Sequence, residues 1–221
     1  STRKESSAAS DVYKRQTLAR AFGRMVPVGE GELFLDGVDI TDLALQELRH
    51  EVAIVPQEGF LFTSTLADNL RYGEPDADTA QVESAATQAR LADDIKGFPD
   101  GYETIVGERG ITLSGGQRQR TALGRALLVD APVLVLDDAL ASVDNNTAAA
   151  ILDSIRAQDG RTIVMISHQL SAAAACDRIL VMDNGQIVQQ GHHNQLIQVA
   201  GVYRRLWERE QAVEGLDAVA S

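Results

Sequence analysis

The sequence predicts an α/β fold with a largely parallel sheet. Short apolar runs alternate with longer segments of amphipathic helical pattern, and the runs at 133–136 and 162–166 are apolar without alternation. Uninterrupted runs of this kind are typical of strands covered on both faces. A helical stretch separates the early strands from the later ones. We therefore expect a core at 17–60 and 128–211 that carries an inserted helical lobe at 61–127.

The N-terminal part of the predicted core contains one helix and two strands. Residues 18–26 have helical periodicity, and residues 33–35 are predicted to form a strand that a turn at 36–37 ends. Residues 52–55 are predicted to form a buried strand. Pro56 ends it, because proline has no N–H to donate to a sheet.

The remaining elements follow in order. In the inserted lobe, residues 65–70 and 78–95 are predicted to be helical, and glycine- and proline-containing loops interrupt them. In the second part of the core, Asp-Asn-Gly at 183–185 predicts a hairpin between two short strands. A last helix is expected near 202–211, and residues 212–221 are expected to form a fraying tail.

Composition excludes several classes of protein. The 221 residues carry a formal charge of −12 and one cysteine, Cys176. One cysteine excludes a disulfide scaffold, and the acidic balance argues against nucleic acid as a partner. No apolar run reaches the ~18 residues that a membrane helix needs. The chain by itself is expected to be soluble.

Residues 1–16 differ from the rest of the chain. They hold two of its three lysines and show no apolar periodicity. Their reverse translation can resemble a common transposase-based sequencing adapter read in frame, so we expect an assembly artefact that is disordered and lies outside the fold. The alternative is a disordered tail rich in serine and alanine. An intact reading frame through these codons in the source DNA would exclude the artefact.

A glycine-containing loop precedes the helix-forming run that starts at Arg118. Ser114 is a favoured N-cap, and Gly115 and Gly116 allow a phosphate to approach backbone N–H groups at the positive end of the helix. On its own, this pattern fits a capped helix after a glycine loop equally well.

Two adjacent acids follow the apolar run at 133–136. Asp137 and Asp138 thus lie at the carboxyl end of a predicted strand, where α/β folds bind ligands and where Mg²⁺ can be held. Two buried neighbouring carboxylates repel each other, which favours a metal–phosphate ligand beside them. The alternative is a loop of exposed acids.

Together these motifs resemble the nucleotide-binding domain of ATP-binding cassette (ABC) transporters over nearly all of 17–211. The resemblance rests on LSGGQ at 113–117, VLVLDD at 133–138, Val-Pro-Gln at 55–57 and Ile-Ser-His at 166–168, which are similar to the signature, Walker B, Q-loop and H-loop in the family's order. Residues 104–110 (TIVGERG) are similar to a loop that characterises exporters and touches the transmembrane partner. The resemblance implies a RecA-like P-loop NTPase core with ATP and Mg²⁺ as ligands.

The resemblance also implies a role for each motif residue. Ser114, Gly115, Gly116 and Gln117 would reach the γ-phosphate of the nucleotide held by the opposite domain of a head-to-tail dimer. Asp137 would hold Mg²⁺ through water, and Gln57 would approach the metal and the attacking water. His168 would contact the γ-phosphate, although a lone histidine after a strand is more often a core residue. Asp144 matches the D-loop, which links the two sites across the dimer.

The pattern departs from the family before Thr17. The Walker A loop, G-x-x-G-x-G-K-[ST], should stand there, but residues 11–16 contain no glycine, and alignment puts Arg15 and Gln16 at the positions of its lysine and Mg²⁺-binding serine. The N-terminal strand and the P-loop are thus expected to be missing. We expect a truncated chain that binds ATP poorly.

A second departure follows Walker B, where hydrolysing sites carry a glutamate as general base and this chain has Asp138. A carboxylate one methylene shorter is misplaced by ~1 Å, which can cost on the order of 10²-fold in rate. Such a weakened site together with an intact LSGGQ resembles one subunit of a heterodimeric exporter. A homodimer remains the alternative.

The resemblance therefore implies a bacterial half-transporter whose intact form sits at the inner membrane, with this domain on the cytoplasmic face and joined to a transmembrane domain. Two other interpretations remain. The domain could bind nucleotide as a regulatory subunit without hydrolysis, or belong to a non-transport ABC ATPase acting on DNA. The 56 residues between Gln57 and Ser114 leave no room for the long coiled coil of the latter class.

Overall fold

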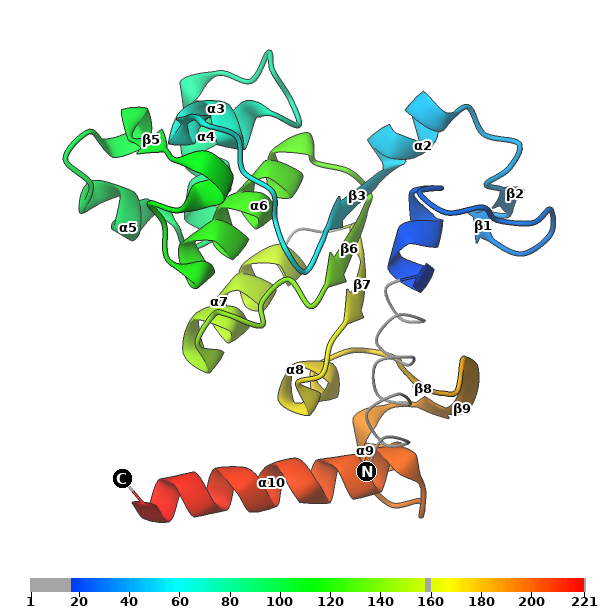
Figure 1. Ribbon diagram of the computed structural model, residues 1–221. Coiled ribbons are helices and arrows are strands. Elements are labelled where there is room, and N and C mark those ends of the chain that lie inside the picture. The colour runs from blue at the N-terminus through cyan, green and yellow to red at the C-terminus, as the bar shows by residue number, and fades with distance from the viewer. Residues whose placement is uncertain (1–16, 158–159, 221) are drawn as a thin grey trace. The chain divides into compact units, whose positions relative to one another are not determined.

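The structure is a computed structural model that describes residues 17–157 and 160–220, and it confirms the α/β fold with a parallel sheet (Figure 1). The expectations for residues 1–16, including Arg15 and Gln16 at phosphate-loop positions, lie outside the described residues. Two compact units divide the chain. The larger comprises Ala19–Ile166, and the smaller is built mainly from the residues after Ile166.

The larger unit contains a parallel sheet in the order β3 (Val52–Val55), β6 (Val133–Asp137) and β7 (Thr162–Ile166). Val55 pairs with Leu136, and Asp137 pairs with Ile166. The central strand β6 is buried along almost its whole length. β7 was expected to be covered on both faces but is only half-buried, because it forms an edge of this sheet in the described part of the chain.

Helices flank both sides of these strands. Figure 1 shows α6 (Gly115–Val129) and α7 (Asn145–Arg156) on one side, with α2 (Leu45–Glu51) and the small hairpin of β1 (Phe34–Leu35) and β2 (Val38–Asp39) on the other. The second side has its own buried cluster, whose fully or nearly buried members are Ala19, Ile40, Leu48, Val52 and Val135. These aliphatic side chains fix the sheet against the N-terminal elements.

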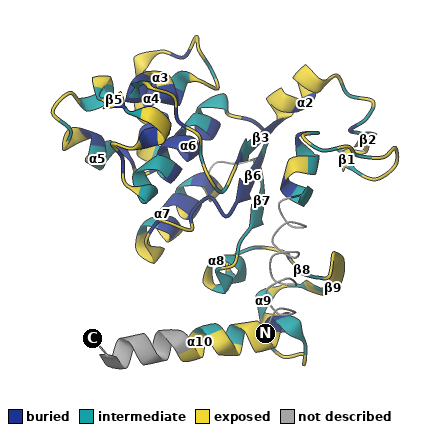
Figure 2. Ribbon diagram, in the orientation of Figure 1, coloured by how far each residue is buried: buried dark blue, intermediate teal, exposed yellow. Residues whose placement is uncertain are grey.

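The segment between β3 and β6 forms a helical lobe with a separate hydrophobic cluster. Before α6, its elements are β4 (Ser64–Thr65), α3 (Leu66–Arg71), α4 (Thr79–Gln88), α5 (Ala92–Lys96), η1 (Gly101–Glu103), β5 (Ile105–Val106) and η2 (Glu108–Gly110). Leu66, Leu70 and Leu91 of this cluster have no exposed surface, and Figure 2 shows the buried faces turned toward one another. The lobe boundaries at 61 and 127 stay a prediction.

The helix expected over 78–95 is broken, contrary to prediction. Arg90 has a left-handed backbone (φ 54) and ends α4. The N–H groups of Arg90 and Leu91 donate to the carbonyls of Thr87 (3.0 Å) and Ala86 (2.8 Å), which is the Schellman pattern of helix ends. Glycine usually marks this position, so an arginine gave no warning of the break.

The smaller unit contains the predicted hairpin and the last helices. β8 (Ile179–Asp183) pairs antiparallel with β9 (Gln186–Gly191), and the turn between them has positive φ at Asn184 and Gly185, as the sequence predicts. The helices are α8 (Leu170–Ala174), α9 (His193–Leu196) and α10 (Val202–Ala220). α10 extends beyond the predicted end at 211, where no proline stands to stop a helix.

None of the helices in the described part of the chain has both the length and the apolar character that a membrane crossing requires.

Candidate functional site

The sheet brings two predicted site segments to one edge. Gln57 stands two residues beyond the end of β3, and Asp137 and Asp138 lie at the end of β6, its parallel neighbour. Paired residues at adjacent strand ends place these segments side by side. Gln57 is half-buried, whereas Asp137 and Asp138 are buried (6% and 8% exposed). The expectation of two buried carboxylates is confirmed.

The backbone at Asp138 is fixed from two sides. Its N–H donates to the carbonyl of Ile166 (2.8 Å), and its carbonyl accepts from the N–H of Ala141 (3.1 Å). Its φ is 46°, in the left-handed region that aspartate tolerates better than most residues. The position of the carboxylate is therefore set by a constrained backbone, and side-chain length decides how far the carboxylate reaches.

The start of α6 is closed by a capping box. The Ser114 hydroxyl accepts from the N–H of Gln117 (3.2 Å), and the Gln117 side chain accepts from the N–H of Ser114 (2.9 Å). Ser114 is exposed, and Gly115–Gln117 are partly exposed. The positive end of a fifteen-residue helix thus faces outward at the predicted phosphate motif.

An ion pair holds this capping box against α5. The Asp94 carboxylate accepts from the Gln117 side-chain amide (2.9 Å) and pairs with the Arg120 guanidinium (2.7 Å). Arg120 also donates to the carbonyl of Arg90. These contacts are partly buried, so they fix the orientation of the Gln117 side chain that closes the cap.

The loop at 139–143 packs directly on the start of α6. A Cβ atom at Gly116 would lie only 2.9 Å from the carbonyl oxygen of Ser142, so glycine permits this approach. At Gly115 the nearest atom, the Cβ of Ser142, would lie at an ordinary 3.5 Å. The structure therefore brings the signature-like residues and the segment that leads to Asp144 together.

Asp144 caps α7. Its carboxylate accepts from the N–H of Thr147 (3.0 Å), and this hydrogen bond, followed by one from the Thr147 side chain, lowers the pKa of Asp144 below its usual value. Asp144 is exposed. The predicted inter-site residue is therefore an ionised, outward-facing N-cap.

His168 belongs to the smaller unit, two residues beyond the end of β7, and it is exposed. Its contact with the phosphate stays a prediction.

Gln119 joins the Gln57 segment to the Ser142 loop and was missed by sequence reasoning. Its side-chain amide donates to the carbonyl of Gln57 (3.3 Å) and accepts from the N–H of Ser142 (2.7 Å). A signal was present, because Gln119 shares a helix face with Ala122, Leu123 and Ala126, all of them buried. A polar side chain on a buried apolar helix face is expected to have hydrogen-bond partners.

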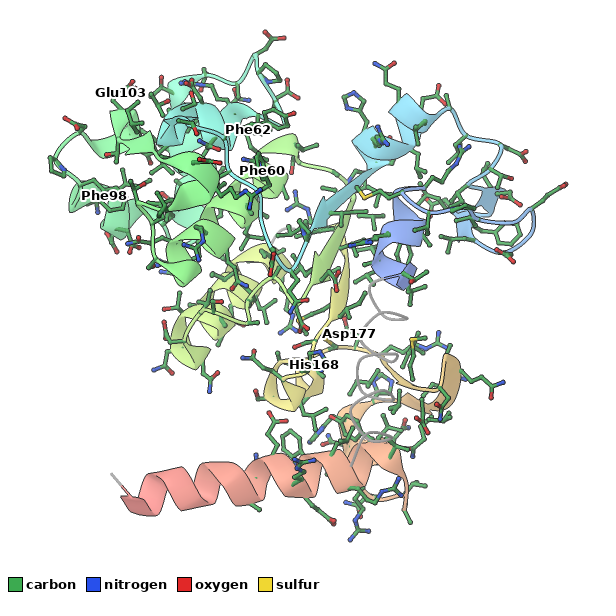
Figure 3. All side chains as sticks on the ribbon, viewed as in Figure 1. Phe60, Phe62, Phe98, Glu103, His168 and Asp177 are labelled. Carbon is green, nitrogen blue, oxygen red and sulfur yellow. The ribbon has the colours of Figure 1, made fainter. Side chains whose placement is uncertain are left out.

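An aromatic group lies on the segment after Gln57. Phe62 stacks on Tyr72 (4.4 Å between ring centroids) and meets Phe60 edge-on (5.0 Å). The guanidinium of Arg125 lies over the rings of Phe62 and Tyr72 and donates to the carbonyl of Phe60 (3.0 Å). Burial lowers the pKa of Arg125. Figure 3 shows Phe60 and Phe62 on the strand-to-helix connection.

These aromatic residues line a pocket of about 850 Å³ that also contacts α2 and α6. Its other lining residues include Arg49, His50, Glu58 and Ala126. Phe60 and Tyr72 are 55% and 60% exposed. Exposed apolar surface beside a pocket is typical of interaction sites, so this pocket is a candidate for one.

The chemistry of the strand-end acids fits a magnesium–phosphate ligand. Asp137 and Asp138 supply hard carboxylate oxygens, and the described residues contain no cluster of three or more acids, histidines or cysteines that could hold a metal by themselves. Mg²⁺ is usually bound by one or two carboxylates together with water and substrate phosphates. The donor set at the end of β6 is of that kind.

Comparison with known proteins identifies relatives of the chain. A family model described as ABC transporter matches residues 15–141. The ATP-dependent lipid A-core flippase of Chromohalobacter salexigens is 44% identical over 193 residues, which are 87% of this chain and 33% of the relative. The multidrug resistance-like ATP-binding protein MdlA of Escherichia coli is 42% identical over 204 residues, or 92% of this chain and 35% of the relative.

A solved structure agrees with this assignment. The structure of a bacterial Atm1-family ABC exporter with ATP bound superposes with a TM-score of 0.85 at 41% identity, covering 88% of this chain and 34% of that one. The chain thus spans about a third of the length of the curated relatives it matches.

Proposed function

This chain belongs to the ABC transporter family, and from that premise we propose that it is the ATP-binding and ATP-hydrolysing part of an exporter subunit. One observation carries the proposal: the exposed, capped start of α6 is held in contact with the loop after the buried Asp137-Asp138 pair. In this proposal, a phosphate-binding helix end and a metal-binding strand end therefore belong to one closely packed cluster of loops.

The two ends serve different nucleotides in this proposal. Asp137, with Gln57 beside it, holds the Mg²⁺ of the nucleotide bound to the same subunit, and His168 contacts its γ-phosphate. Ser114, Gly115, Gly116 and Gln117 face outward and bind the γ-phosphate of the nucleotide on a second subunit packed head to tail. The metal neutralises charge on the transferred phosphate when it is bound. Asp144, ionised at neutral pH, connects the two sites.

The chain's own site turns over slowly in this proposal. The Asp138 backbone is fixed by its bonds to Ile166 and Ala141, so the shorter side chain is not compensated by a shift of the strand. The outward-facing signature residues are intact. The subunit thus completes the working site of a partner that carries glutamate after its own Walker B acid, as in a heterodimeric exporter.

The membrane domain binds at the aromatic pocket and at the loop 104–110. The pocket combines the exposed rings of Phe60 and Tyr72 with the Gln57 segment, and the loop presents Ile105, 58% exposed, next to a fully buried Val106. Ile111, just after the loop, is 81% exposed. This apolar surface lies near Gln57, which is predicted to approach the attacking water. It supports a link between the nucleotide state and a transmembrane partner at the cytoplasmic face of a bacterial inner membrane.

A second candidate is a subunit that binds nucleotide for regulation and does not hydrolyse it. Asp138 favours this candidate, because the same shortened carboxylate that slows turnover could abolish it. Retention of unhydrolysed ATP at this subunit's own site after many turnovers of the complex supports the second candidate. Slow release of ADP from that site supports the first.

The test of the proposed function is ATP hydrolysis by the full-length subunit in lipid vesicles, alone and with its partner subunit. We expect turnover of ATP by the assembled pair and little by the subunit alone. Equal rates with and without the partner would contradict the composite site, and no turnover by the pair would contradict the proposed function.

A further inference from the structure

We infer that Gln119 is a positioning residue that makes the Gln57 segment and the Ser142 loop move as one body. Its side chain lies between two backbones that are far apart in the sequence, accepting from Ser142 N–H at 2.7 Å and donating to the Gln57 carbonyl at 3.3 Å. The inference rests on the proposed function, because only there do these two loops serve one reaction.

The chemistry of the two backbones fixes the orientation of the amide. A backbone N–H can only donate and a carbonyl can only accept, so the side-chain oxygen must face Ser142 and the side-chain nitrogen must face Gln57. Glutamine is the side chain of this length that offers one donor and one acceptor. Glutamate keeps the acceptor and loses the donor, whereas methionine has nearly the same length and shape and loses both.

Close packing on both sides leaves the bridge little freedom. A Cβ atom at Gly59 would lie 2.5 Å from the Cβ of Ala122, so the Gln57 segment lies directly on α6. On the other side, a Cβ atom at Gly116 would lie 2.9 Å from the carbonyl oxygen of Ser142. Gln119 is 8% exposed between these two contacts, so water does not readily replace a lost partner.

The bridge also reaches the residue that connects the two nucleotide sites. Ser142 precedes the buried Val143 and the N-cap Asp144, whose bond to Thr147 N–H starts α7. A displacement of the Gln57 carbonyl is therefore transmitted through one side chain to the Asp144 loop. In the assembled pair, the Gln119 bridge would couple the Gln57 segment of this subunit's own site to the Asp144 loop, which contacts the partner's site in the proposed function.

Hydrogen exchange of the 221-residue chain tests the contact without any activity. One net hydrogen bond corresponds to roughly 2- to 10-fold in local opening. In Gln119→Met we expect the Ser142 amide to exchange roughly 2- to 10-fold faster, together with the amides of residues 57–60. In Gln119→Glu we expect the Ser142 amide to stay protected while residues 57–60 exchange faster. Unchanged exchange at both segments in the methionine variant would overturn the inference.

A matched control uses the same change of charge on an exposed glutamine. Gln198 is exposed and lies in the smaller unit. Gln198→Glu is expected to leave exchange at both segments unchanged. If Gln198→Glu accelerated residues 57–60 as much as Gln119→Glu does, the effect would come from net charge and the bridge would be refuted.

ATP hydrolysis by the full-length pair tests the consequence. Because the Ser142 loop packs on Gly116, which serves the partner's working site in the proposed function, in Gln119→Met we expect kcat of the pair to fall at least about fivefold while KM for ATP changes less than twofold. We expect Gln119→Glu to lie between this variant and the wild type. A rise in KM with unchanged kcat would overturn the positioning role. If the wild-type pair shows no hydrolysis, the proposed function fails, and the exchange experiment still decides whether the bridge exists.

Discussion

Two adjacent glycines at the start of α6 should respond differently to the same methyl group. In Gly116→Ala the new Cβ would lie 2.9 Å from the carbonyl oxygen of Ser142, whereas in Gly115→Ala the nearest atom, the Cβ of Ser142, would lie at 3.5 Å. The 3.5 Å distance is an ordinary van der Waals contact, whereas 2.9 Å is too short for one. Either the Ser142 loop or the first turn of α6 must shift by about 0.5 Å in the first variant.

The loop cannot retreat freely from the methyl group. The N–H of Ser142 is held by Gln119, and the next residue, Val143, is buried (7% exposed). Overpacking against a held backbone costs roughly 1–3 kcal/mol. Both variants gain up to about 1 kcal/mol of helix propensity at neighbouring positions. That gain largely cancels when the two are compared, which leaves a difference of about 1–3 kcal/mol.

The assay is urea unfolding of the 221-residue chain, followed by far-UV circular dichroism. We expect Gly115→Ala to match or exceed the wild-type free energy of unfolding and Gly116→Ala to fall below Gly115→Ala by the difference above. Equal free energies of the two variants would refute the close approach of Ser142 to α6. A larger loss in Gly115→Ala would refute it as well.

Three further predictions follow from named contacts. The Asn69 side-chain amide is buried (1% exposed) and bonds both backbone groups of Phe62 and the guanidinium of Arg125. Asn69→Ala should therefore lower the free energy of unfolding in urea by roughly 2–4 kcal/mol. A loss smaller than that of an exposed Gln198→Ala control would contradict this prediction. In the full-length pair, Asp138→Glu should raise single-site turnover at this subunit's own site by up to about 10²-fold, and no change would count against a misplaced base. The hydrogen bonds from Thr147 lower the pKa of Asp144, so the cap stabilises the fold above the unfolded pKa, and this stability is lost as the pH falls through the folded pKa. Carboxyl NMR of Asp144 should give a titration midpoint below 3.8. A higher midpoint would exclude the cap.

Several elements of the fold could be predicted because short sequence patterns, such as an apolar run or a turn motif, determine where they begin and end. The strand at 52–55 agrees with β3 at both ends, and Asp-Asn-Gly at 183–185 places the β8–β9 turn correctly. The break at Arg90 and the half-buried state of β7 depend on tertiary packing. No glycine marks the first, and the second depends on which strand forms the sheet edge.

The candidate site was predicted in its parts and not in its connections. The buried pair Asp137-Asp138 and the Ser114 cap follow from strand-end and capping patterns, which are local. Gln119 bonds to a backbone 62 residues earlier and to another 23 residues later. Such a bridge depends on how two loops pack around one helix, and spacing along the chain does not encode that arrangement.

The central claim is that this chain's signature residues serve the partner's nucleotide while its strand-end acid serves its own. The most direct measurement compares ATP turnover of the full-length pair carrying either Ser114→Arg or Asp137→Asn in this subunit. We predict that Ser114→Arg lowers turnover by at least about tenfold, while Asp137→Asn, which affects only the slow site, retains most of it. Loss of turnover in Asp137→Asn with retention in Ser114→Arg would contradict the account.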